Sequence, residues 1–324
     1  KISLALKRYI VISIYPKFYD AFKCKGADCK NTCCQKWEID IDADSVARYE
    51  SMPGPLGDDV RAAMTVTDGV HHFKFNKDGK CPLLQDGLCR IVLDHGEDGL
   101  CDICHMHPRF FKYIGELELC GVGLSCEESC ELLMGIAFDE QVIGEDSDMN
   151  TYANHEMHRS QNQNLEFIIP GIEEIYHIED IIAEIGIELP TEDFQFEPIP
   201  SAEDYSMLFD IMSGLEALSP KWSEQLHELT QNPEMAAVKT AIYWEHCNQS
   251  MFNRLYQYIL YRQLDQVTEH YPDSVVAYAR DSTEFILICS AVFGEPLIQT
   301  ALWSEQIEYD EDNVELLFNT YDEI

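Results

Sequence analysis

The clearest pattern of apolar and polar positions lies in the last third of the chain. Apolar residues recur there at spacings of three and four, which indicates one buried helical face; the first such series is Leu208, Ile211, Met212, Leu215 and Leu218. Asn232 followed by Pro233 predicts the start of a second helix, because asparagine is favoured at N-caps and proline in the first turn. A third helix is predicted over roughly residues 274–293, before Gly294 and Pro296.

The front of the chain carries a different pattern. Short apolar runs such as Phe73–Phe75 alternate with cysteines and glycines, which favours short helices, turns and a hairpin. From Asp139 to Pro200 the chain is acidic and interrupted by prolines, so we expect a linker with one helix over about residues 171–185. The predicted fold is mainly α, in three parts: an irregular cysteine-rich metal-binding region at 1–135, an acidic linker at 136–200 and an α-helical domain at 201–324.

Charge is divided unevenly along the chain. There are 22 Lys and Arg against 59 Asp and Glu, a formal net charge of −37. Residues 1–130 hold 16 basic and 20 acidic side chains, a net of −4, whereas residues 131–324 hold 6 and 39, a net of −33. Nucleic acid is not an expected partner, because phosphate binding needs positive charge. An acidic field of this size would attract a cationic partner, and it also keeps a protein in solution.

The sequence contains no apolar run long enough to cross a bilayer, so no membrane association is expected. The apolar stretch Ile10–Tyr15 is too short for the core of a signal peptide, and no small-residue cleavage site follows it. We therefore expect a cytoplasmic protein. In a reducing compartment, clustered cysteines are interpreted as metal ligands or catalytic thiols before disulfides.

Eleven of the thirteen cysteines fall between Cys24 and Cys130. The candidate metal ligands among them are Cys29, Cys33, Cys34, Cys81, Cys89, Cys101, Cys104 and Cys126. The Cys101-x2-Cys104 spacing lets two thiolates from one turn reach a single metal ion or one edge of a cluster. Four thiolates complete either a tetrahedral zinc site or a [4Fe-4S] cluster, and these residues leave both open.

An ordered series of motifs surrounds these cysteines. It comprises Phe22-x-Cys24, Cys29-x3-Cys33-Cys34-x2-Trp37, Cys81-Pro-Leu-Leu, Gly87-Leu-Cys89-x-Ile91, Gly96-Glu97-x2-Leu100-Cys101-x2-Cys104, Pro108-Arg109 and Leu124-Ser125-Cys126-x-Glu128. Over about residues 16–135 the series resembles the bacterial flagellin lysine-N-methylase family, and the wider group of cysteine-rich proteins labelled as zinc- or iron-chelating. Glu127 stands where that pattern leads us to expect proline.

The resemblance implies methyl transfer from S-adenosylmethionine to lysine side chains of flagellin or another protein, with an iron–sulfur cluster as cofactor. The lysine amine must be neutral to attack a methyl group, so a base or desolvation must lower its pKa. His105, Glu116 and Glu118 are candidates near that step, and Arg109 could hold the carboxylate of the methyl donor as a two-pronged donor. Each also has a structural interpretation: an ion pair for Arg109, a solvated hairpin for the glutamates and a surface position for His105.

A second hypothesis needs no catalysis. In it, zinc or a cluster stabilises an adaptor whose acidic helical half binds a basic protein partner. Iron with acid-labile sulfide would favour the methyltransferase, and a colourless protein with stoichiometric zinc would favour the adaptor.

Overall fold

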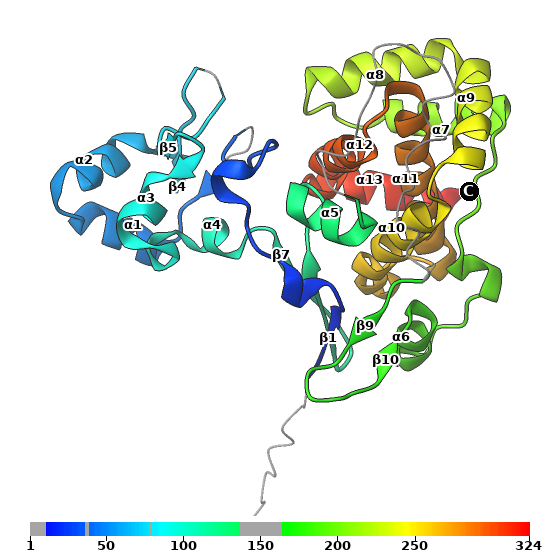
Figure 1. Cartoon of the computed structure of the whole chain (residues 1–324), viewed down its shortest axis with the longest axis horizontal. Helices are drawn as coiled ribbons and strands as arrows, with labels where there is room; N and C mark the ends of the chain where they lie inside the picture. The colour runs from blue at the N-terminus through cyan, green and yellow to red at the C-terminus, as the bar shows by residue number, and fades with distance from the viewer. Residues whose placement is uncertain (1–10, 36–38, 78, 137–163) are drawn as a thin grey trace, which may run out of the picture. The chain divides into compact units, whose positions relative to one another are not determined.

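The computed structural model describes residues 11–35, 39–77, 79–136 and 164–324. Its contacts divide the chain into two compact units. The cysteine unit consists of Lys23–Phe110 together with Cys126–Glu128. The helical unit consists of Lys1–Phe22, Phe111–Ser125 and Ser129–Ile324. In Figure 1 most of the cysteine unit is blue to cyan, and most helices of the helical unit run from green to red.

The cysteine unit combines short helices with small sheets. Its elements in chain order are η2 (Gly26–Asp28), β2 (Ile39–Asp40), α1 (Ala43–Ser51), α2 (Gly54–Ala63), β3 (Met64–Thr67), β4 (Val70–Phe73), β5 (Leu84–Gln85), β6 (Leu88–Cys89), α3 (Arg90–His95), η3 (Glu97–Gly99) and α4 (Asp102–Met106). One sheet has the strand order β2-β4-β3, and β5 pairs with β6. Both hairpins turn through Asp-Gly pairs with positive φ at both residues, Asp68-Gly69 and Asp86-Gly87. Two-residue hairpin loops need this left-handed backbone, which explains why Asp-Gly occupies them.

The core of the cysteine unit contains thiols as well as apolar side chains. Tyr49 of α1 and Val60 of α2 are fully buried in it, together with Cys101. Asp42 caps α1, since its carboxylate accepts a hydrogen bond of 2.8 Å from the N–H of Ser45. The cysteines that line this core therefore lie in surroundings of low polarity.

The helical unit contains most of a five-stranded sheet of order β10-β9-β1-β8-β7. The strands are β1 (Ile12–Pro16), β7 (Arg109–Ile114), β8 (Leu117–Val122), β9 (Phe167–Ile168) and β10 (Ile175–Tyr176). β1 runs parallel to β8, with Ile12 opposite Leu117, and antiparallel to β9. β7 begins in the cysteine unit and ends in the helical unit.

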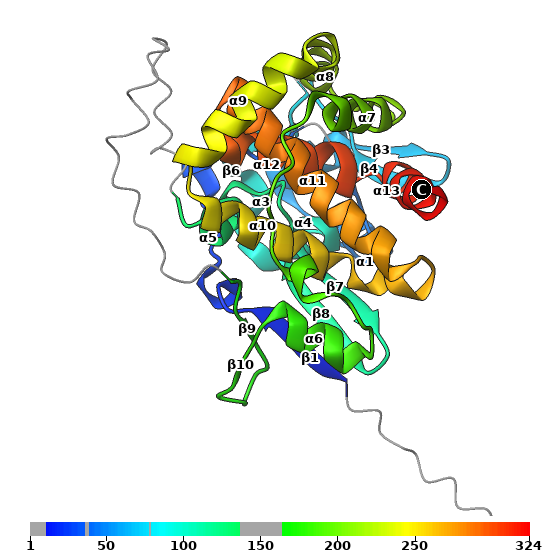
Figure 2. The same cartoon turned by 90° about the vertical axis from the view of Figure 1, so that its right-hand side faces the viewer.

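Helices make up most of the remaining helical unit. They are η1 (Tyr19–Ala21), α5 (Glu127–Met134), α6 (Ile178–Ile185), η6 (Thr191–Phe194), α7 (Ala202–Ser213), α8 (Pro220–Gln231), α9 (Pro233–His246), α10 (Gln249–Arg262), η7 (Leu264–Thr268), α11 (Pro272–Phe293), α12 (Pro296–Trp303), η8 (Ser304–Glu308, a π-helix) and α13 (Glu311–Glu323). α11 is buried along much of its length and packs against α9, α10, α12 and α13. Figure 2 shows α10 beside α11, with the sheet strands gathered at one end of the helices.

Two tyrosines of α10 join the helices to the sheet. The hydroxyl of Tyr258 donates to the carbonyl of Val122 at 2.7 Å and accepts from its N–H at 2.8 Å. The hydroxyl of Tyr261 lies 2.8 Å from the carbonyl oxygen of Ile14 and 2.9 Å from that of Cys120. The sheet and the helices are therefore joined through buried hydrogen bonds within the helical unit.

Most helix predictions are confirmed, and the mainly α character with them. The first stripe lies largely on α7, Pro233 begins α9 and the helix expected at 274–293 is α11. Asn232 stands at the N-cap of α9 as predicted, but its side chain makes no cap hydrogen bond to α9 and donates instead to the carbonyl of Glu228 in α8. The helix expected from residue 171 begins only at Ile178, because β9 and β10 form ahead of it.

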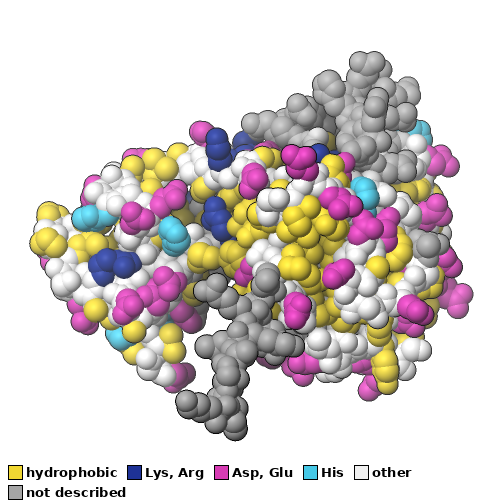
Figure 3. All heavy atoms as spheres, turned by 90° about the horizontal axis from the view of Figure 1, so that it is seen from below, with side chains coloured by type: hydrophobic (Ala, Val, Ile, Leu, Met, Phe, Trp, Pro, Cys, Tyr) yellow, Lys and Arg dark blue, Asp and Glu magenta, His cyan; other side chains and the backbone are white. Residues whose placement is uncertain are grey.

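Acidic side chains are spread over the face shown in Figure 3, and basic ones are few there, in keeping with the net charge. In the described ranges, we find no helix with both the length and the apolar character needed to cross a bilayer.

Glu284 of α11 gives the helical unit a predictable dependence of stability on pH. Its side chain is buried and accepts a hydrogen bond of 2.6 Å from the hydroxyl of Tyr205. Burial raises the pKa of Glu284 to about 7, and the charges of Asp281 and Arg280 act on it in opposite directions. The folded state therefore binds this proton more tightly than the unfolded state, so the contribution of Glu284 to stability falls as pH rises from about 4.5 to about 7.

We expect Glu284→Gln to remove this fall and to be more stable than the wild type at pH 8, by on the order of 3 kcal/mol at most. Urea unfolding at pH 5 and pH 8 measures the effect. Glu234→Gln, at an exposed position of α9, is the matched control. The same pH dependence in wild type and Glu284→Gln would contradict the assignment.

Candidate metal centre

Five cysteines belong to the core of the cysteine unit or pack against it, near enough for their charges to act on one another, and we name them the inner thiol group. Cys81 and Cys101 are buried members of that core, and Cys34, Cys89 and Cys104 pack against it. The N–H of Cys81 donates to the carbonyl of Cys34 at 2.9 Å, next to the bridge between Gln35 and Lys80. All thirteen cysteines of the chain lie within the described ranges, and none is joined in a disulfide.

The segment that carries Cys101 is held by α1. The hydroxyl of Tyr49 donates to the carbonyl of Gly99 at 3.0 Å, and Arg48 donates to that of Leu100 at 2.8 Å. Asp42, the cap of α1, also accepts from the N–H of Asp102 at 3.0 Å, which fixes the start of α4. This bond is the main reason why the pKa of Asp42 is lowered to about 2. Cys101 and Cys104 thus enter the core from a fixed helical turn.

The thiols of this group are close enough to change each other's protonation. A hydrogen bond with Cys104 lowers the pKa of Cys101 to about 7 and raises the pKa of Cys104. A hydrogen bond with Cys33 likewise lowers the pKa of Cys34 to about 7. Burial raises the pKa of Cys81 to about 11, and the negative charges of Cys34, Cys89 and Cys101 add to it. Thiolates in such a group gain from a positive partner, as a metal centre provides.

Four further cysteines form what we name the outer thiol group: Cys24, Cys29, Cys33 and Cys126. Burial raises the pKa of Cys29 to about 12, and the charges of Glu127, Cys126 and Cys24 contribute. Cys126 and Cys24 also act on Cys33, which is hydrogen-bonded to Cys34 of the inner group. The two groups therefore meet at the adjacent residues Cys33 and Cys34.

Glu127 explains how residues about a hundred positions apart in sequence come together in the outer group. Its side chain is only 1% exposed and lies 2.7 Å from the ammonium of Lys25. The same carboxylate accepts from the N–H groups of Lys30 and Asn31 at 2.8 and 3.0 Å, and it lies 3.7 Å from the sulfur of Cys29. The position that departs from the expected motif is thus the one that holds the Cys29 loop beside Cys126.

The donor chemistry of the inner thiol group fits a thiolate-ligated centre. Soft thiolates are the ligands of zinc and of iron–sulfur clusters, and here five thiols lie in or against one apolar core. In the part of the chain that the structure describes, no three Cys, His, Asp or Glu side chains are already grouped as ligands of a single ion. A cluster spreads its ligands over several irons, so it does not require that close grouping.

The other predicted site residues do not form one constellation. His105 is exposed on α4, with its Nδ1 3.4 Å from the carbonyl oxygen of Glu97, and Arg109 is half-buried at the start of β7. Glu116 is exposed in the turn between β7 and β8, in the helical unit. Glu118 accepts hydrogen bonds from the hydroxyls of Ser13 and Tyr113, which lower its pKa.

The roles suggested for His105, Arg109, Glu116 and Glu118 stay predictions, and Trp37 lies outside the described residues. The sequence reasoning missed Asp42, Tyr49 and Glu127 as residues that position the thiols. The only advance signal was that Glu127 departs from the motif.

The chain is similar in sequence to two kinds of Salmonella protein. A lysine-N-methylase of Salmonella typhimurium is 28% identical over 106 residues, and one of Salmonella choleraesuis is 30% identical over 107 residues. The flagellar biosynthetic protein FliU of Salmonella muenchen is 27% identical over 143 residues. The chain is distantly related to the lysine-N-methylases.

The relationship covers only part of each protein. The matches take in 29% of this chain and 25% of each lysine-N-methylase, and 40% of this chain and 80% of FliU. No family model matches the chain. No solved structure matches it either.

Proposed function

We propose that this chain is a protein lysine N-methyltransferase that uses S-adenosylmethionine, with flagellin as its substrate and a [4Fe-4S] cluster on the inner thiol group. The observation that carries the proposal is the similarity to two proteins named lysine-N-methylase. The name of FliU supports a flagellar substrate. The five gathered thiols, with two lowered pKa values among them, support the cofactor.

Methylation of an amine sets clear demands on the protein. The lone pair of a neutral lysine amine forms a bond to the methyl carbon, the carbon–sulfur bond of the sulfonium breaks, and S-adenosylhomocysteine leaves with that electron pair. The substrate ammonium must lose its proton before attack, so a base or an apolar entry must lower its pKa. A bound iron–sulfur cluster supplies one-electron chemistry at a potential set by its burial and hydrogen bonds.

The acidic surface suits a cationic side chain as substrate. Residues 131–324 carry a net charge of −33, which raises the local concentration of a lysine-bearing partner. A field of this kind steers approach but does not choose one lysine over another. Selection must therefore come from shape and contacts at the reacting site.

The proposal predicts two results from protein purified without oxygen. It should hold iron and acid-labile sulfide in equal amounts, about four of each per chain. It should also transfer label from the methyl group of S-adenosylmethionine to flagellin, and the label should appear on lysine after hydrolysis. Flagellin with its lysines acetylated is the matched control substrate, since an acetylated amine has no available lone pair.

Two outcomes would contradict the proposal in different ways. Zinc without labile sulfide would refute the iron–sulfur cluster but would not decide whether the protein transfers methyl groups. No transfer by the cluster-loaded protein, to flagellin or to bulk cell protein, would refute the proposed enzymatic activity. The acidic charge of residues 131–324 would then favour a zinc- or cluster-binding adaptor for a basic protein partner.

A further inference from the structure

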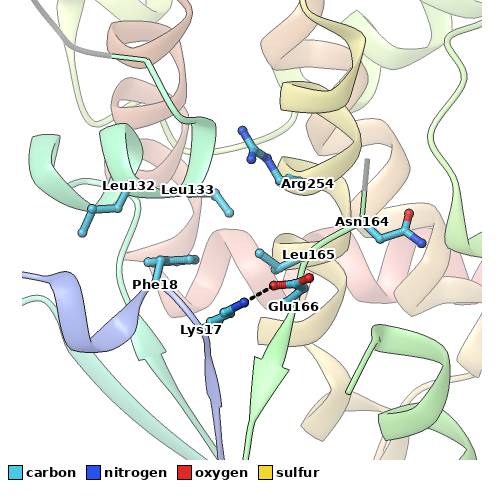
Figure 4. Close-up of a pocket in the computed structure, with 8 residues that line it drawn as sticks. All are labelled: Lys17, Phe18, Leu132, Leu133, Asn164, Leu165, Glu166 and Arg254. Atoms are coloured by element: carbon cyan, nitrogen blue, oxygen red, sulfur yellow. Dashed lines mark hydrogen bonds and ion pairs between the residues drawn. The ribbon is translucent and has the colours of Figure 1, made fainter. Parts of the chain in front are cut away.

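A cavity of about 260 Å³ opens in the helical unit, between the end of β1, α5, α10 and the segment leading into β9. Its described lining includes an apolar wall and three charged side chains: Phe18, Leu132, Leu133, Lys17, Glu166 and Arg254. Figure 4 shows Arg254 beside Leu133 at one end and the Lys17–Glu166 pair at the other. Pockets for whole drug-sized ligands start at about 300 Å³, so this cavity suits a smaller group or one end of a larger ligand.

The charges of this lining do not cancel. Lys17 and Glu166 form an ion pair with 2.7 Å between Nζ and Oε2. Arg254 donates from Nη2 to the carbonyl oxygen of Met134 at 2.6 Å, but its buried Nε–H meets no hydrogen-bond acceptor among the residues that the structure describes. The three charged residues of the described lining thus leave one positive charge over, in a chain whose net charge is −37.

Arg254 is held in place and pays a desolvation cost there. Its guanidinium packs against Gly135, where an added Cβ would lie 2.9 Å from Nη2. Burial lowers the pKa of Arg254, which means that the site works against its positive charge. A guanidinium in such a position gains from a carboxylate, because a charge-assisted hydrogen bond offsets the lost hydration.

The apolar wall and Glu166 define the rest of a matching ligand. Phe18, Leu132 and Leu133 offer contacts for a short aliphatic or thioether chain, and sulfur packs well against an aromatic ring. A carboxylate has about four acceptor positions, so Glu166 can accept from an ammonium group while it binds Lys17. A carboxylate, an ammonium and a short sulfur-bearing chain together describe a methionine-like amino acid, whose sulfur is a sulfonium in S-adenosylmethionine and a thioether in S-adenosylhomocysteine.

We infer that this cavity binds the methionyl end of S-adenosylmethionine, with its carboxylate on the guanidinium of Arg254 and its ammonium at Glu166. The inference rests on the proposed function for the identity of the ligand. It gives Arg254 the role that the sequence suggested for Arg109. The adenosyl part would extend from the cavity opening.

The test measures binding to the full, cluster-loaded chain by isothermal titration calorimetry, without flagellin or turnover. S-adenosylhomocysteine is the main probe, and 5′-methylthioadenosine, which lacks the amino-acid end, is the control probe. Arg254→Gln should weaken binding of S-adenosylhomocysteine by about tenfold or more and leave methylthioadenosine unchanged. Arg280→Gln, a matched change of another half-buried arginine of the helical unit, which pairs with Asp193, should leave both unchanged.

Unchanged affinity of Arg254→Gln for S-adenosylhomocysteine overturns the inference, as does a wild-type chain that binds none. Arg254→Lys keeps the positive charge but loses the two-pronged donor geometry of the guanidinium. An intermediate affinity of this variant shows that the weaker binding of Arg254→Gln comes from the lost charge and not from misfolding. Binding that depends on Arg254 without any methyl transfer would refute the proposed function and keep the site. Methyl transfer that is unchanged in Arg254→Gln would support the proposed function and refute this binding site.

Discussion

Replacing Glu127 with alanine is expected to lower the free energy of unfolding of the cysteine unit by about 3 kcal/mol. The carboxylate is 1% exposed and receives the ammonium of Lys25 and the N–H groups of Lys30 and Asn31. Burial opposes its ionisation, but these donors outweigh burial and hold the pKa of Glu127 below its usual range. Alanine removes a buried acceptor that three donors share, and such losses are among the most destabilising in proteins.

Urea unfolding, followed by circular dichroism and by the reaction of exposed thiols with a thiol reagent, measures this loss. Glu127→Gln should be less damaging, because it keeps an acceptor oxygen and loses only the charge. Glu116→Ala is the control, since that glutamate is exposed in the turn after β7 and should change stability by about 0.5 kcal/mol or less. If Glu127→Ala is as stable as the wild type, the hydrogen bonds of Glu127 do not hold the Cys29 loop.

The helices could be predicted from the sequence because their signals are local. A three- and four-residue repeat locates α7, and Pro233 locates the start of α9, without knowledge of any partner. Asn232 occupies the N-cap of α9 but also ends α8, and its amide donates to the carbonyl of Glu228, four residues earlier, instead of capping α9. The local rule names which residues can cap, and the neighbouring helix decides which bond forms.

The sheet of the helical unit could not be predicted in this way. β1 pairs with β8, which follows most of the cysteine-rich region in the sequence. Tyr261 and Tyr258 of α10 donate to backbone carbonyls of the two strands, Ile14 in β1 and Val122 in β8. Pairing between distant strands depends on register and on which side chains fill the space between them, and neither is written in a short window of sequence.

For the candidate site, the sequence located the thiols but not their grouping. Spacing shows that Cys101 and Cys104 share a turn, and α4 confirms that they do. The division into inner and outer groups depends on Glu127, which acts through backbone N–H groups of Lys30 and Asn31 that carry no sequence signal. Adjacent Cys33 and Cys34 belong to different groups, which no spacing rule would have assigned.

Four of the five single serine variants of the inner thiol group should lose the visible absorbance and labile sulfide of the cluster. A cubane cluster takes four thiolate ligands, and the group offers five, so one thiol is spare. Serine is a harder and less acidic donor than cysteine and is a poor substitute at iron. Methyl transfer to flagellin should fall together with the cluster in those four variants. Anaerobic iron and sulfide analysis of Cys34→Ser, Cys81→Ser, Cys89→Ser, Cys101→Ser and Cys104→Ser gives the answer directly.

The controls separate a lost ligand from a damaged fold. Cys247→Ser, at the end of α9 in the helical unit, and Cys24→Ser, at the exposed member of the outer group, should keep the full iron content. Bleaching by Cys24→Ser or Cys29→Ser, with the inner variants intact, would move the cluster to the outer group. If all five inner variants keep their full iron and sulfide content, the inner thiol group does not bind the cluster. Since Cys33 and Cys34 are adjacent and hydrogen-bonded, their two serine variants form the sharpest comparison. Cys33→Ser should keep the cluster, and Cys34→Ser should lose it unless Cys34 is the one spare thiol of the inner group.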